Sequence, residues 1–102
     1  MYARVSNYVL PPEGVEQAIS GFAELPIEEL EGFSGAYLLV DRESGKSITI
    51  TLWDSEAALE KSVERANQMR AQVTQNVGGQ TTDVAHYEVG VAKEPTGAAS
   101  GG

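Results

Sequence analysis

The sequence contains no cysteine, a single histidine and few basic residues. A chain without cysteine has no disulfide, no thiolate metal site and no cysteine nucleophile, and one histidine cannot supply a site built from several imidazoles. Seven Lys and Arg residues against fifteen Asp and Glu residues give a net charge of −8 and an isoelectric point near 4.4. Such a surface repels phosphate groups, so we expect neither nucleic acid nor an anionic membrane as a partner, and we expect no metal site.

Long apolar runs and a leader-like start are absent as well. No segment approaches the roughly 20 apolar residues that a membrane span needs. Residues 1–10 lack both the basic start and the apolar centre of a signal peptide. We therefore expect a cytoplasmic protein. Its 102 residues, of which 41% are hydrophobic and 22% charged, are enough for one domain with one small core.

What the sequence does contain is an alternation of strand-like and helix-like segments. Strands are predicted where β-branched and aromatic residues gather, and helices where apolar residues recur at a spacing of three and four. The predicted order is strand, helix, strand, strand, helix, strand, over residues 3–10, 14–25, 33–41, 46–53, 54–75 and 82–91. Residues 1–93 then form the folded domain. Residues 94–102 are rich in Gly, Ala and Ser, which predicts a flexible C-terminal tail.

The connections predict how these segments are arranged. Both helices join strands as crossovers, and the loop at 41–46 has the length of a hairpin turn. This order predicts an α+β fold, a ferredoxin-like βαββαβ unit whose four-stranded antiparallel sheet carries both helices on one face. The other face would carry Ile48, Ile50 and Leu52. Because exposed apolar area is costly, we expect a second copy to cover that face, so that the chain pairs as a homodimer with a barrel-like core.

Three segments carry a family resemblance. They are the Gly-Phe-Ser-Gly segment at 32–35, the Leu-Trp-Asp-Ser-Glu segment at 52–56 and the His-Tyr-Glu-Val segment at 86–89. Together they resemble the dimeric α+β-barrel superfamily and, within it, the antibiotic-biosynthesis-monooxygenase (ABM) domain. The resemblance covers about residues 3–91 and implies a cavity between the sheet and the two helices of each subunit. Proteins similar to this one include oxygenases that act on polycyclic phenols without a cofactor and enzymes that degrade heme.

The resemblance also bears on heme. Its heme-degrading members carry an Asn on the first strand, a Trp at the end of the third strand and a His on the second helix. Asn7 and Trp53 match the first two positions. The second predicted helix has no histidine, and His86 lies in the last predicted strand. Because heme needs an axial ligand, we expect neither heme nor any other bound cofactor.

Asn7 and Trp53 are the candidate catalytic residues, because an amide and an indole N–H can hold a phenolate or enolate oxygen. Thr51 shares a strand face with Trp53, and Phe22 and Met69 would line the cavity from the two helices. Tyr37 or His86 could relay a proton. For each of these side chains, packing in the core, the sheet or the interface is the alternative role. The predicted substrate-binding set is Asn7, Phe22, Tyr37, Thr51, Trp53, Met69 and His86.

These observations leave two classes of function open. The first is an ABM-like monooxygenase that binds a small aromatic or polyketide-like substrate and works without a bound cofactor. The alternative is a non-catalytic homodimer that binds a small hydrophobic ligand or a partner protein. A heme-binding or heme-degrading protein is a third, disfavoured by the missing helix histidine. The lining of the cavity discriminates between the first two.

Overall fold

The computed structural model describes residues 1–95, and residues 96–102 lie outside that description. The predicted fold class is confirmed: the four strands form one antiparallel sheet in the order β2-β3-β1-β4. The elements are β1 (Tyr2–Val9), the short 3-10 helix η1 (Pro12–Gly14), α1 (Val15–Glu24), η2 (Ile27–Glu29), β2 (Phe33–Val40), β3 (Lys46–Trp53), α2 (Glu56–Lys61), α3 (Val63–Val77) and β4 (Gln80–Glu88).

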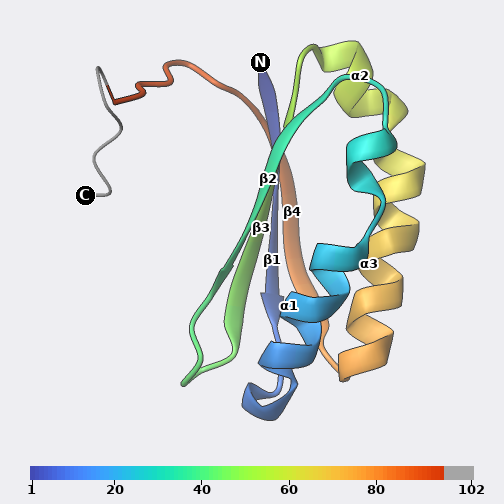
Figure 1. Cartoon of the computed structure of the whole chain (residues 1–102), viewed down its shortest axis with the longest axis vertical. Coiled ribbons are helices and arrows are strands. Elements are labelled where there is room, and N and C mark those ends of the chain that lie inside the picture. Colours follow the sequence, from blue (N-terminus) through green and yellow to red (C-terminus); the bar gives the residue numbers. More distant parts are fainter. Residues whose placement is uncertain (96–102) are drawn as a thin grey trace.

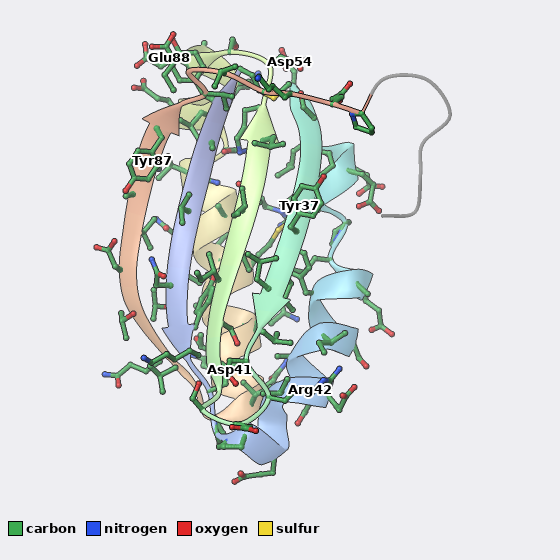
Figure 2. The ribbon with its side chains drawn as sticks, turned by 90° about the vertical axis from the view of Figure 1, so that its left-hand side faces the viewer. Tyr37, Asp41, Arg42, Asp54, Tyr87 and Glu88 are labelled. Atoms are coloured by element: carbon green, nitrogen blue, oxygen red, sulfur yellow. The ribbon has the colours of Figure 1, made fainter. Side chains whose placement is uncertain are left out.

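All the helices lie on one face of the sheet, and the other face carries none (Figure 1). We call these the covered face and the open face. Figure 2 looks onto the open face, where Tyr37 of β2 and Tyr87 of β4 lie in front of the strands. These two side chains are 59% and 56% exposed in the single chain, which is a large apolar exposure for a strand surface.

Local sequence accounts for the ends of several elements. Ser55 begins α2, because its side chain accepts a hydrogen bond from the backbone N–H of Ala58 at 3.1 Å. Gly78 ends α3 in a left-handed conformation that favours glycine. Gly45, with a φ of +79°, turns the β2–β3 hairpin where a side chain would overlap the carbonyl oxygen of Leu10.

Two of the predicted boundaries are wrong. The single helix predicted over 54–75 is two helices, α2 and α3, interrupted at Ser62. The last strand begins at Gln80 and ends at Glu88, earlier than the predicted 82–91, because α3 stops at Val77 and leaves only a two-residue turn. The strand predicted over 46–53 matches β3. The predicted tail, 94–102, lies outside the described residues from position 96 onward.

The core under the helices is divided into two clusters. One surrounds Trp53 near α2, and the other surrounds Leu10 near the start of α1. Trp53 is completely buried and packs edge-on against Phe33, with ring centroids 5.8 Å apart. The space between the two clusters is where the candidate site lies.

Candidate functional site: a cavity between the sheet and the helices

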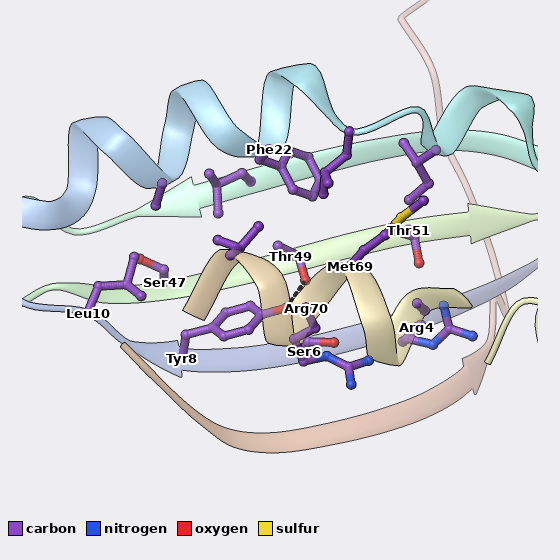
Figure 3. A pocket seen from close by; sticks show the side chains of 16 residues that line it. Arg4, Ser6, Tyr8, Leu10, Phe22, Ser47, Thr49, Thr51, Met69 and Arg70 are labelled. Atoms are coloured by element: carbon purple, nitrogen blue, oxygen red, sulfur yellow. Dashed lines mark hydrogen bonds between the residues drawn. The ribbon is translucent and has the colours of Figure 1, made fainter. Parts of the chain in front are cut away.

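A cavity of about 60 Å³ lies between the covered face of the sheet and helices α1 and α3 (Figure 3). Its sheet wall is polar, because β1 and β3 turn hydroxyl and guanidinium groups toward the helices. Its helix wall is largely apolar. The polar lining is Arg4, Ser6, Tyr8, Ser47, Thr49, Thr51 and Arg70. The apolar lining includes Phe22, Leu25, Ile27, Leu38, Met69 and Val73.

Strand register explains the polar wall. Arg4 pairs with Thr51, and Ser6 pairs with Thr49, and paired residues on adjacent strands point to the same face. The Tyr8 hydroxyl lies 3.2 Å from the Thr49 hydroxyl, drawn as a dashed line in Figure 3. A row of hydroxyls in this position can orient a polar group of a bound molecule, and the apolar wall opposite can exclude water from it.

Arg4 is the most constrained polar group of the cavity. It is only 3% exposed although it carries a charge. Its Nη2 donates to the backbone oxygen of Leu59 at 3.0 Å and to the Ser62 hydroxyl at 2.8 Å, and its Nε donates to His86 Nε2 at 3.3 Å. Its guanidinium also lies 5.7 Å from the centre of the Trp53 ring, within cation–π range. These contacts hold Arg4 between β1, β4 and the helix layer.

The interruption of the helix at Ser62 supplies two of those contacts. The Ser62 hydroxyl donates to the Leu59 oxygen at 2.6 Å, and that oxygen also accepts from Arg4. A Ser side chain that bonds the carbonyl three residues earlier competes with the regular helix ladder. The Leu59 carbonyl is thereby directed toward Arg4. The boundary between α2 and α3 is therefore part of the site.

Burial lowers the pKa of one group in the cavity and of one group beside it. Desolvation, aided by the nearby positive charge of Arg70, lowers the pKa of Arg4 to about 10, so that it stays protonated at neutral pH. Desolvation and the Arg4 charge also lower the pKa of His86. The hydrogen bond from Arg4 to His86 Nε2 favours the neutral imidazole with its proton on Nδ1.

Of the predicted substrate-binding residues, Phe22, Thr51 and Met69 line the cavity. Trp53 is not in the lining. Its indole Nε1 donates to Thr51 Oγ1 at 3.0 Å, so Trp53 orients a residue that does line the cavity. His86 also lies outside the lining, on the edge strand β4, where it contacts Arg4.

The expectation that Asn7 and Trp53 line one cavity is wrong. Strands β1 and β3 are neighbours, but their register pairs Asn7 with Ile48 and Tyr2 with Trp53. Asn7 lies between two cavity residues of its strand and therefore points to the open face. Tyr37 pairs with Ile50 and lies on that same open face (Figure 2).

Sequence analysis missed Arg4. A signal was present, because Arg4 is a charged residue in a strand, at a position that alternates with Ser6 and Tyr8. Only the register could show that this side faces the helices. Arg70, which is partly buried on α3, was also absent from the predicted site residues, although it lines the cavity together with Arg4.

A surface groove lies outside the cavity, between α1 and α3. Its volume is about 390 Å³. Leu25 and Val73 line both the groove and the cavity, so these two side chains separate the inner space from the surface.

Two further findings concern metal ions and membranes. Within residues 1–95, no group of three or more His, Asp or Glu side chains is placed to hold a metal ion. No helix in this part of the chain is both long enough and apolar enough to cross a membrane.

Comparison with curated proteins finds relatives in Mycobacterium tuberculosis. The chain is 35% identical over 86 residues to the uncharacterized protein Rv2557 and 33% identical over 73 residues to the uncharacterized protein Rv2558. These matches cover 81% and 69% of this chain but only 38% and 31% of the relatives. The chain therefore spans about a third of the length of the curated relatives it matches. No family model matches it.

Comparison with solved structures finds the same fold in several oxygenases. The monooxygenase ActVA-Orf6 of Streptomyces coelicolor, solved with nanaomycin D, matches with a TM-score of 0.69 and 15% identity, over 93% of this chain and 92% of that one. SnoaB of Streptomyces nogalater, a cofactor-independent oxygenase, matches with a TM-score of 0.63 and 14% identity over 93% and 95%.

A heme-degrading protein has this fold too. MhuD of Mycobacterium tuberculosis, solved with two hemes in its active site, matches with a TM-score of 0.66 and 18% identity, over 92% of this chain and all of that one. At such low identity these likenesses concern the arrangement of the backbone.

Proposed function

We propose that this chain, which has the ABM type of dimeric α+β-barrel fold, binds a small molecule, and that its cavity takes an aromatic or polyketide-like ligand. The observation that carries this proposal is the cavity itself, apolar on the helix side and lined by a row of hydroxyls on the sheet side. Small-molecule sites generally combine an apolar enclosure with a few directed polar groups. In this proposal Phe22, Thr51 and Met69 contact the ligand, and Trp53 positions Thr51.

Binding of a large ligand requires the cavity to widen. Its volume of about 60 Å³ is well below the roughly 300–1,000 Å³ of sites for drug-sized molecules. Rotation of Leu25 and Val73 would join the cavity to the groove between α1 and α3. We propose that ligand entry is coupled to this rearrangement.

The reaction we propose is monooxygenation without a bound cofactor. The electrons come from an electron-rich substrate, one atom of O₂ enters the product and the other leaves as water. What this chain contributes is a water-poor space, hydroxyl donors and a guanidinium that stabilise a developing oxyanion. The likeness in fold to SnoaB, a cofactor-independent oxygenase, supports this choice of reaction.

The alternative, a non-catalytic binding protein, is favoured by the absence of a base. Within the described part of the chain, the cavity lining contains neither a carboxylate nor an imidazole. An oxygenase of this type needs a group that accepts the substrate proton. The substrate must then reach the cavity already ionised, or the protein only binds it.

Heme does not fit the residues of this cavity. Helices α2 and α3 contain no histidine, and His86 lies outside the lining and accepts a hydrogen bond from Arg4. We therefore propose a protein that works without heme.

We propose that a second copy covers the open face. This proposal is supported by the large apolar side chains there, including Tyr37 and Leu39, which are 59% and 48% exposed in the single chain. Ile48, Ile50 and Leu52 lie between them and β1 on the same face. An interface formed by one patch on both subunits suits two-fold symmetry. A cytoplasmic location stays a prediction.

The test measures binding and turnover of 1,5-dihydroxynaphthalene. Trp53 is the chain's one tryptophan, so its fluorescence reports binding near the cavity. An oxygen electrode follows uptake of O₂. We expect Ala66→Leu, which fills the cavity from α3, to weaken binding at least tenfold. Ala71→Leu, on the exposed side of the same helix, is the matched control and should bind as the wild type does.

The outcomes separate the candidates. Oxygen uptake above the protein-free rate, lost in Ala66→Leu, supports the oxygenase. Binding that is lost in Ala66→Leu without oxygen uptake supports the binding protein. Equal binding by Ala66→Leu and Ala71→Leu would show that the cavity is not the site.

A further inference from the structure

We infer that the ligand of this cavity carries a carboxylate, and that Arg4 and Arg70 bind it. The inference rests on the proposed function, because it assigns the charge of a ligand in the same cavity. It starts from one atom. Nη1 of Arg4 is buried and has no hydrogen-bond partner, and within residues 1–95 no other buried side-chain nitrogen or oxygen lacks one.

The rest of the Arg4 side chain is held in place. Nη2 donates to Leu59 and Ser62, and Nε donates to His86, so the guanidinium cannot turn Nη1 toward solvent without losing these bonds. A buried charged donor without a partner costs more free energy than a neutral one. An acceptor that arrives with the ligand removes this cost.

The second observation is the charge of the lining. Two guanidiniums, Arg4 and Arg70, line the cavity, and no carboxylate among the described residues lines it with them. Arg70 is partly exposed and donates to the neutral Asn67 side chain at 2.7 Å, and among residues 1–95 no acidic side chain forms a salt bridge with it. In a chain with a net charge of −8, this is a local reversal of sign. Two like charges repel each other, and an anion between them would be attracted to both.

A carboxylate meets these requirements better than a phenol. It is ionised at neutral pH, whereas a free phenol with a pKa of about 10 is not, and the cavity offers no base to ionise one. A carboxylate also has two oxygens, which match the donors of a guanidinium and the neighbouring hydroxyls. Thr51 and Ser6 lie on the same wall and can donate to the second oxygen. The inferred ligand is therefore an apolar or aromatic molecule whose carboxylate lies beside Arg4.

The experiment compares pairs of probes that differ only in charge: benzoate with benzamide, and 2-naphthoate with 2-naphthamide. Binding is followed by Trp53 fluorescence, because Arg4 lies 5.7 Å from that ring. In the wild type we expect each acid to bind at least 30-fold more tightly than its amide. In Arg4→Met this preference should fall to less than threefold. Arg65→Met, which removes an exposed charge from α3, is the matched control and should keep the preference.

The variants also cover a failure to fold. If Arg4→Met is unfolded by circular dichroism, Arg70→Met provides the second test, and we expect it to reduce the preference for the acid at least fivefold. Equal binding of acids and amides to the wild type would overturn the inference while leaving the cavity as a ligand site. A preference for the acid that persists in Arg70→Met and in a folded Arg4→Met would also overturn it. Binding that is unaffected by Ala66→Leu would instead overturn the proposed function.

Discussion

The two faces of the sheet reverse the usual distribution of polar and apolar residues. Strand β3 shows this most directly. Ser47, Thr49 and Thr51 are buried under the helices, whereas the alternate residues Ile48, Ile50 and Leu52 lie on the face that carries no helix. In an ordinary two-layer domain, the apolar side of each strand would face the helices and the polar side would face water.

This reversal indicates that neither face suits a single chain in water. Hydroxyls buried under a helix layer contribute less to the stability of the core than apolar side chains would. Here these hydroxyls line a cavity. Apolar side chains on an open face lose about 25 cal/mol for each Å² that stays exposed. The proposed ligand would account for the covered face, and the proposed second copy would account for the open face. The predictions below test each face in turn.

The largest effect is expected on the open face. Ile50→Glu places a charge among the apolar residues of the open face, which the proposed interface would bury. We expect the dimer to weaken by about 3 kcal/mol or more, roughly 100-fold or more in its dissociation constant. Sedimentation velocity over a range of concentrations measures this.

The control for that change is Gln68→Glu, which adds the same charge to the exposed side of α3. It should leave the sedimentation behaviour unchanged. A wild type that sediments as a single chain at every concentration would contradict the explanation given for the open face. So would an Ile50→Glu variant that remains dimeric.

A smaller effect is expected on the covered face. Thr51→Val removes the acceptor of the Trp53 indole N–H and leaves a buried donor without a partner. The expected loss in the free energy of unfolding is about 1–3 kcal/mol, although the new side chain is more apolar. Urea denaturation measures it. Combining Thr51→Val with Trp53→Phe should recover part of the loss, and purely additive effects in this double-mutant cycle would show that the hydrogen bond contributes nothing.

The smallest effect concerns pH. The pKa of His86 is lowered by desolvation and by Arg4, so the unfolded chain binds a proton more readily than the folded one as the pH falls below about 6.5. His86 therefore contributes stability above that pH and loses it below. Because His86 is largely exposed, we expect only a few tenths of a kcal/mol. Urea midpoints at pH 7 and pH 5.5 should differ less in His86→Gln than in the wild type, and an equal difference would contradict this assignment.

Much of the architecture could be predicted from the sequence because its signals are local. The strand predicted at 46–53 coincides with β3, and the helix predicted from residue 54 begins close to the start of α2 at Glu56. The hairpin loop, the order of elements and the apolar character of the open face followed from the same kind of pattern. Such local signals are enough to indicate the fold class and the family resemblance.

The site was only partly predictable, because it depends on register and on contacts between distant segments. Thr51 and Met69 line the cavity, and their role in binding stays a prediction, whereas Asn7 lies on the open face. A shift by one residue moves a side chain to the other face, and the sequence alone does not state which residues pair. The interruption at Ser62 was missed for a similar reason, since it involves Arg4 from 58 positions away.

The interruption of the helix at Ser62 also links the sheet to the helix layer. Through it, Arg4 of the sheet is bonded to the carbonyl and hydroxyl of the helix layer at the α2 end of the molecule. Between α1 and α3, Leu25 and Val73 line both the groove and the cavity. We therefore expect any opening toward the cavity to occur between these two helices, while the contacts of Arg4 with the helix layer stay in place. A ligand that enters beside α1 would first be selected by its shape and then by its charge, when it reaches Arg4 at the α2 end.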